Sequence, residues 1–114
     1  MHFIIFDLEA TCWERATEAQ QKKQEIIEIG AVKLDENGDY ISSFAEFIRP
    51  VFHPTLSDFC QRLTSISQVD VNRARYFADV AEDFRLWVEE DEHGEVGEYL
   101  FCSWGFFDQR ILSK

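Results

Sequence analysis

The chain has 114 residues, of which 46% are hydrophobic and 15% aromatic, so it can bury a core and is not a disordered segment. Its 11 Lys and Arg face 22 Asp and Glu, and the net charge of −11 argues against a basic surface that grips nucleic-acid phosphates directly. The charge does not exclude a site where metal cations bridge protein carboxylates to phosphates.

The first half of the chain reads as three strands. Residues 2–8 are apolar, β-branched and aromatic, which predicts a buried strand. The polar segment 14–24 has no core periodicity and is expected to be a solvated loop or a frayed helix. Residues 25–35 and 40–50 are two further strands joined by a tight Asn37-Gly38 turn, which is a strong hairpin signal.

The second half changes to helical spacing. Residues 55–63 predict a short helix, with Thr55 and Asp58 at the spacing of an N-terminal cap. Residues 77–90 predict a longer helix with a core-facing apolar stripe. The stripe consists of Phe77, Val80, Ala81, Phe84 and Val88, with Trp87 packing beside it.

An acidic loop, 89–98, leads to an apolar strand at 99–104, and residues 105–114 resemble the start of a helix. The expected order is β–β–β–α–α–β–α, with an antiparallel hairpin and a later crossover to a parallel strand. We expect residues 1–114 to form a single α/β domain.

The cysteines and the N-terminus indicate the compartment. Cys12, Cys60 and Cys102 are odd in number and far apart, which argues against a disulfide scaffold or a zinc ribbon and favours a reducing environment. The first apolar run is short, is interrupted by Asp7 and has no basic lead, so neither a signal peptide nor a membrane span is expected. We therefore expect a cytoplasmic protein that does not associate with membranes.

Carboxylates gather where two of the predicted strands end. Asp7 and Glu9 lie on one face of the first strand, and Asp108 follows the strand at 99–104. If these strands are neighbours, three carboxylates converge, and such hard oxygen ligands suit Mg²⁺ or Mn²⁺. The spacing alone leaves another interpretation open, because acids at strand ends also serve as helix caps or turn residues.

Longer motifs resemble a known family. The segments FDLEATCW, EIIEIGAV, FIRP, HPTLSDFCQRLTSISQVDV and SWGFFD occur in the order found in DEDDh 3′–5′ exonucleases of the DnaQ-like, RNase H-like superfamily. The chain is most similar to the branch with the histone-mRNA and small-RNA 3′ exonucleases and their bacterial sporulation-inhibitor-like relatives. The resemblance implies an RNase H-like mixed sheet, antiparallel hairpin plus parallel strands, with flanking helices and an incomplete C-terminal part.

The resemblance also implies roles for individual residues. Asp7, Glu9 and Asp108 match the acids that hold two divalent ions, with Asp7 bridging both. The backbone at Ala10 and Thr11 is expected to meet the terminal nucleotide. Further substrate-binding positions are implied at Leu63, Thr64, Ile66 and Trp104. Glu28 matches an acid on the second strand, and a site role and a purely structural role remain equally open for it.

The family's third motif, a His followed by a fourth acid, is absent after Asp108. The remaining histidines, His2, His53 and His93, are not expected to replace it. Two explanations stay open: a fragment of a longer exonuclease, which we favour, or a short form that pairs with itself or with a partner chain.

The residues alone predict a three-carboxylate metal site on an α/β sheet. The resemblance implies a metal-dependent 3′–5′ exonuclease domain, weak or inactive as this chain, that acts on single-stranded RNA or DNA 3′ ends and releases nucleoside 5′-monophosphates. The alternative is a non-catalytic module that binds nucleic acid or protein. A ribonuclease H-like endonuclease is disfavoured by the LSDFCQRLT segment.

Overall fold

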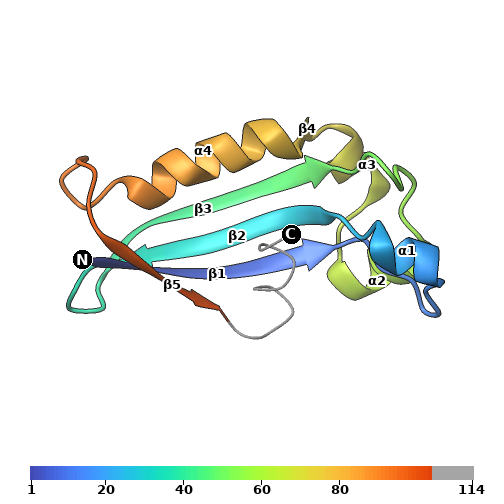
Figure 1. The fold of residues 1–114 in the computed structure, drawn as a ribbon, viewed down its shortest axis with the longest axis horizontal. Helices are drawn as coiled ribbons and strands as arrows, with labels where there is room; N and C mark the ends of the chain where they lie inside the picture. The colour runs from blue at the N-terminus through green and yellow to red at the C-terminus, as the bar shows by residue number, and fades with distance from the viewer. Residues whose placement is uncertain (104–114) are drawn as a thin grey trace.

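A computed structural model describes residues 1–103, which form a mixed sheet flanked by helices (Figure 1). The sheet has the order β4-β3-β2-β1-β5. β1 pairs antiparallel with β2, and β2 pairs antiparallel with β3, whereas β1–β5 and β3–β4 are parallel. The strands are β1 (His2–Ala10), β2 (Ile26–Leu34), β3 (Tyr40–Arg49), β4 (Arg75–Tyr76) and β5 (Tyr99–Ser103). The predicted hairpin and the parallel crossover are both confirmed.

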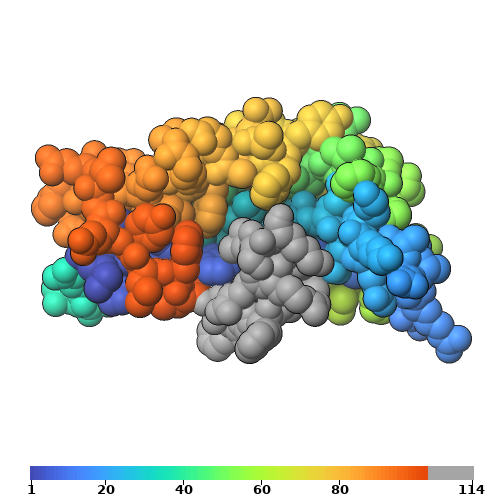
Figure 2. Space-filling model, viewed as in Figure 1, coloured from blue at the N-terminus to red at the C-terminus, as the bar shows by residue number. Residues whose placement is uncertain are grey.

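The helices occupy two places. α4 (Phe77–Glu89) runs along the sheet, and the shorter helices gather at the end where β1 finishes (Figure 1). The shorter helices are α1 (Glu18–Lys22), α2 (Asp58–Thr64) and α3 (Gln68–Asn72). The molecule is elongated, 44 × 28 × 23 Å, with the segment containing α1 and the loop after α4 at opposite ends (Figure 2). None of the helices in residues 1–103 is long and apolar enough to cross a bilayer.

The main core lies between α4 and one face of the sheet. Val80, Phe84 and Val88 of α4 are buried there, as predicted, and Trp87 packs against the same cluster. Their partners on β1 are the residues at even positions, Ile4, Phe6, Leu8 and Ala10. The predicted stripe was wrong at Phe77, the first residue of α4, which is 48% exposed and lies outside the cluster.

A second buried cluster fixes the short helices to the end of the sheet. It contains Ile27 of β2 together with Leu56, Cys60, Ile66 and Val71, and Cys12 and Phe47 pack against it. This cluster holds α2 and α3 beside the end of β1. The short helices are therefore packed at the same end of the sheet as the carboxyl end of β1.

Local hydrogen bonds explain where the short elements begin. The segment 14–24 contains α1, whose Thr17 and Gln20 form a reciprocal capping box. Ser57, not the predicted Thr55, caps α2, because its Oγ accepts from the Cys60 amide at 3.0 Å. α3 was not predicted; its own capping box joins Ser67 and Asp70.

The end of α4 is capped by two buried side chains from the sheet. Lys33 Nζ donates to the carbonyl oxygens of Trp87 and Glu90, and its ammonium lies 4.5 Å from the centroid of the Trp87 ring. His2 Nε2 lies 2.6 Å from the Val88 carbonyl oxygen, so this nitrogen carries the proton. The two side chains satisfy carbonyls that the helix leaves without intrahelical partners.

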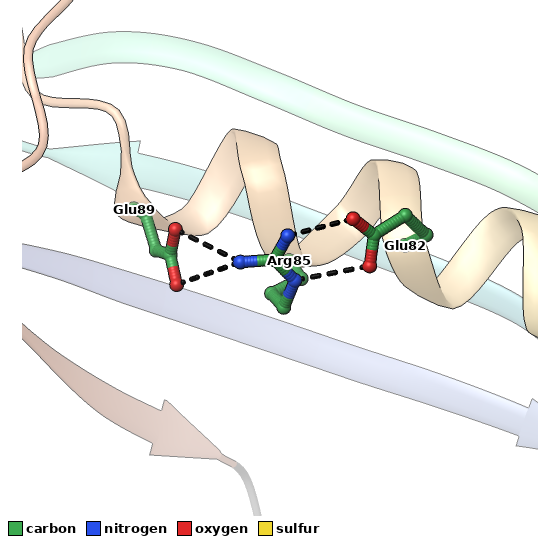
Figure 3. A network of polar contacts seen from close by, with 3 residues as sticks. All are labelled: Glu82, Arg85 and Glu89. Atoms are coloured by element: carbon green, nitrogen blue, oxygen red, sulfur yellow. Dashed lines mark hydrogen bonds and ion pairs between the residues drawn. The ribbon is translucent and has the colours of Figure 1, made fainter.

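The solvent face of α4 carries a charged network (Figure 3). Arg85 binds Glu82 through two nitrogens, at 2.6 and 3.0 Å, and Glu89 through a third at 3.1 and 3.2 Å. The side chains of these pairs are about half exposed, so the ion pairs add little to stability. Their spacings of three and four residues place the side chains beside each other on the helix surface.

Candidate functional site

Asp7 and Glu9 lie on the face of β1 that points away from α4. The even-numbered residues of β1 are buried against α4, so the alternation of a strand places both carboxylates on the opposite face. Asp7 is exposed and Glu9 is half-buried. The predicted side-by-side arrangement is therefore present at the carboxyl end of β1.

β2 adds a third carboxylate to this face. Glu28 is the direct cross-strand partner of Glu9, and Gly30 is the partner of Asp7. A Cβ built at Gly30 would meet only the Asp7 carbonyl oxygen, at 3.9 Å, so the space beside the Asp7 carboxylate is open on the β2 side. Asp7, Glu9 and Glu28 thus form one acidic patch, which we call the acidic row.

The three carboxylates of the acidic row create a negative electrostatic potential that attracts cations. Burial, and secondarily the carboxylates of Asp7 and Asp70, raise the pKa of Glu28. Negative charges held this close are costly without a counter-ion. Their hard oxygens, not nitrogen or sulfur, are the donors that Mg²⁺ and Mn²⁺ prefer, so the residues present fit such an ion.

β5 is the neighbour of β1 in the sheet, which is the condition under which the carboxylates were expected to converge. The two strands are parallel, and Ser103 pairs with Phe6, one residue before Asp7. Asp108 and Trp104 lie outside the described residues. Within residues 1–103, no group of three His, Cys, Asp or Glu side chains has the arrangement that would hold a metal ion by itself. Convergence of Asp7, Glu9 and Asp108 therefore stays a prediction.

The chain after β1 is fixed by its backbone groups. Ala10 and Thr11 are both buried, and the Thr11 amide donates to the Glu25 carbonyl at 2.8 Å. The Thr11 carbonyl oxygen accepts from Gln24 Nε2 at 2.9 Å, and the Thr11 hydroxyl accepts from the Glu25 amide at 3.0 Å. The amide, carbonyl and hydroxyl groups of Thr11 are therefore all engaged in hydrogen bonds within the protein.

Glu25 holds the neighbouring loop in place through hydrogen bonds, a role that no local sequence pattern indicates. Its carboxylate accepts from three successive backbone amides, of Val51, Phe52 and His53, at 2.6, 2.9 and 3.0 Å. Through its own amide and carbonyl, Glu25 also holds Thr11. One residue thus ties the end of β1 to the loop that follows β3.

The predicted substrate-binding residues on and after α2 differ in accessibility. Leu63 is 66% exposed, and Thr64 is half-buried with its hydroxyl donating to the Cys60 carbonyl at 2.8 Å. Ile66 is only 2% exposed and belongs to the second cluster. The side chain of Ile66 therefore supports the core, and an exposed apolar contact for a base is available at Leu63.

The aromatic and histidine side chains near the site also have defined places. Trp13 meets the ring of His53 edge-on, with 4.8 Å between ring centroids. His53 Nε2 is buried and has no hydrogen-bond partner in the described part of the chain. His93 lies in the exposed loop after α4, with its Nε2 3.6 Å from Glu92 Oε1, at the far end of the molecule from the acidic row.

Comparison with protein-family models and known sequences gives consistent results. The model of the exonuclease family RNase_T matches residues 4–110. ERI1 exoribonuclease 2 of Xenopus laevis is 38% identical over 90 residues, which cover 78% of this chain and 13% of the relative. The 3′-5′ exonuclease eri1 of Schizosaccharomyces pombe is 36% identical over 90 residues, with 78% and 30% covered. The chain thus spans less than a third of the length of these two relatives.

Solved structures agree with the sequence comparison. The nuclease domain of 3′hExo, a DEDDh family member bound to rAMP, superposes with a TM-score of 0.85 at 32% identity, covering 98% of this chain and 56% of that chain. A 3′-exonuclease solved for its 3′-end specific recognition of the histone mRNA stem-loop gives a TM-score of 0.81 at 32% identity, with 94% and 47% covered. The shared fold includes the strands that carry the acidic row.

Proposed function

The chain belongs to the RNase_T exonuclease family, and on that premise we propose that it is the N-terminal part of a metal-dependent 3′–5′ exonuclease domain that acts on single-stranded RNA 3′ ends. The observation that carries the proposal is the pairing of Asp7 and Glu9 on one open face of β1, with Glu28 opposite and β5 running parallel alongside. The products would be nucleoside 5′-monophosphates.

The residues of the acidic strand have defined parts in this proposal. Asp7 and Glu9 would hold divalent ions, Mg²⁺ or Mn²⁺, with Asp108 as a further ligand. Such ions supply an activated water and stabilise the leaving oxygen of a phosphodiester. The exposed side chain of Leu63 stacks on the last base, and the backbone at Ala10 and Thr11 meets the terminal nucleotide.

The choice of RNA rests on the relatives. Several of the sequence relatives are named exoribonucleases, and one structural neighbour was solved with rAMP. A net charge of −11 fits a substrate held through bridging cations rather than through a basic surface. A single-stranded DNA substrate is the competing outcome, and the assay below distinguishes the two.

We expect weak activity from these 114 residues alone, because none of the residues assigned to the site is a histidine that could act as the general base of the family motif. Such a base contributes roughly 10²–10⁴-fold to a reaction rate. A non-catalytic module that binds nucleic acid is therefore the second candidate function.

The test mixes the full 114-residue chain with a single-stranded RNA that has a free 3′ end and a label at its 5′ end. Mg²⁺ or Mn²⁺ is then added in increasing concentration. Stepwise shortening that requires the metal and disappears in Asp7→Asn supports the exonuclease. Metal-dependent binding without shortening supports the module. Internal cuts, or equal cleavage by Asp7→Asn, would overturn the assignment of Asp7. The same strand as DNA decides the sugar preference.

We also propose a cytoplasmic location. Cys12, Cys60 and Cys102 are all free thiols, which is the state expected in a reducing compartment.

A further inference from the structure

Two cysteines from distant parts of the sequence meet beside the acidic row. Cys12 follows Glu9 by three residues, and Cys60 lies in the middle of α2. Cys12 packs against the buried cluster that contains Cys60. The two residues therefore connect the end of the acidic strand with the helix that carries Leu63.

The backbones of the two residues are also held close together. A single atom, Ser57 Oγ, donates to the Cys12 carbonyl at 2.7 Å and accepts from the Cys60 amide at 3.0 Å. Cys60 Sγ additionally lies 3.7 Å from the carbonyl oxygen of Ala10, two residues before Cys12. A disulfide needs α-carbons roughly 4.4–6.8 Å apart, so it requires two backbones that are held near each other, as the shared Ser57 hydroxyl holds these two.

The two thiols differ in accessibility. Cys60 is 1% exposed, whereas Cys12 is half-buried and lines a pocket of about 340 Å³ with Trp13 and Gln24. A small oxidant can thus reach Cys12 while Cys60 is shielded. Burial, and then the influence of Cys60, raise the pKa of Cys12 to about 12, so the Cys12 thiol is protonated at neutral pH and reacts slowly with oxidants.

We propose that Cys12 and Cys60 close a reversible disulfide when the protein meets a peroxide, joining the end of β1 covalently to α2. In the first step the Cys12 sulfur attacks one oxygen of hydrogen peroxide and the O–O bond breaks. Cys12 becomes a sulfenic acid, and the second oxygen is released as water with the thiol proton. In the second step Cys60 sulfur attacks Cys12 sulfur, the S–O bond breaks, and a second water leaves with the S–S bond formed. The peroxide accepts both electrons, and a thiol reductant reverses the link.

The consequence for the site rests on the proposed function. A covalent link between Cys12 and Cys60 fixes α2, and with it Leu63, relative to the strand that carries Asp7 and Glu9. The link itself can be detected without any nuclease assay, so its test is independent of whether the chain cuts RNA.

The experiment treats the folded 114-residue chain with hydrogen peroxide and reads the intact mass and a non-reducing tryptic map. The expected result is a loss of two hydrogens and a cross-linked pair of the tryptic peptides 1–15 and 34–62, which contain Cys12 and Cys60. The thermal midpoint should rise in the oxidised protein and return after a thiol reductant is added.

Three variants provide the controls. Cys102→Ser should still form the link, whereas Cys12→Ser should lose both the link and the rise in thermal midpoint. Cys60→Ala should also lose the link, with its fold checked by circular dichroism. Linkage of the 86–110 peptide instead, oxidation of Cys12 only to its sulfinic or sulfonic acid, or a link that forms only in urea would each overturn the proposal.

Discussion

Glu9 and Glu28 are direct cross-strand partners in the β1–β2 ladder, so two carboxylates of like sign lie opposite each other on adjacent strands. Like charges in this relationship destabilise an antiparallel pair. Repulsion between the two carboxylates lowers the stability of the fold, and a bound cation would offset it. Such an arrangement is expected at a site that binds a cation.

Replacing one of these two charges should stabilise the metal-free protein. We expect Glu28→Gln to raise the free energy of unfolding by about 0.2–1 kcal/mol in buffer with a chelator, measured by urea denaturation. Saturating Mg²⁺ should remove this gain, since the cation offsets the repulsion in the wild type. Glu46→Gln, an exposed change on β3 with Ile29 as its cross-strand partner, should change stability by less than about 0.5 kcal/mol. A loss of stability in metal-free Glu28→Gln would contradict the repulsion argument.

Divalent ions should stabilise the folded chain through Asp7. A ligand that binds only the folded state at 100 times its dissociation constant adds about 2.7 kcal/mol. We expect the thermal midpoint to rise with added Mn²⁺ in the wild type and to stay constant in Asp7→Asn. Glu95→Gln, in the exposed loop at the other end of the molecule, should keep the full rise. An equal rise in all three proteins would place the ion elsewhere.

The carboxylate of Glu25 should be worth more than an ordinary surface acid. Glu25→Ala leaves three backbone amides of the loop 51–53 without their acceptor, and we expect a loss of about 1–3 kcal/mol in the free energy of unfolding. Hydrogen exchange of the three amides should accelerate as well. Glu25→Gln, which retains one acceptor oxygen, should lose less. Glu14→Ala, an exposed change nearby, is the matched control, and exchange rates in Glu25→Ala equal to those of that control would refute the clamp.

Lys33 should give the stability of the protein a distinctive dependence on alkaline pH. Burial lowers the pKa of Lys33, so the unfolded chain holds this proton more tightly than the folded one. The free energy of unfolding therefore gains from Lys33 as pH rises from its lowered pKa to the usual value of about 10.4. The wild type should become more stable relative to Lys33→Met across that window, in paired urea titrations. Lys22→Met, on exposed α1, should show no such trend.

Much of the fold followed from local patterns. The three N-terminal strands and α4 were predicted from runs of apolar residues whose spacing is 2 or 3.6, and both patterns survive in the packed core. The Asn37-Gly38 turn was predicted from composition, and Gly38 indeed has a φ of 84°, which a residue with a side chain rarely adopts. Such signals are carried by neighbouring residues, so one sequence is enough to detect them.

The features that were missed depend on residues far apart in the sequence. Glu25 binds a loop that begins 26 residues later, and His2 binds α4 across a separation of 86 residues. The residues around Glu25 and His2 in the sequence contain no pattern that predicts these hydrogen-bond partners. Ile66 carried a family expectation of base contact, but its neighbours in space bury it. Asp108 and Trp104 lie outside the described residues, and association with a second chain likewise stays a prediction.

The sheet order also has a consequence for the time course of folding. β1, β2 and β3 follow one another along the chain and pair antiparallel, whereas β5 reaches β1 only after closure of a loop from Ala10 to Tyr99. Non-local parallel pairing is slow to form. In pulse-labelling hydrogen exchange, we expect amides of the β2–β3 hairpin to become protected before those of β5. The acidic strand would then be anchored along one edge first, and the strand that precedes Asp108 would dock onto a nearly finished nucleus.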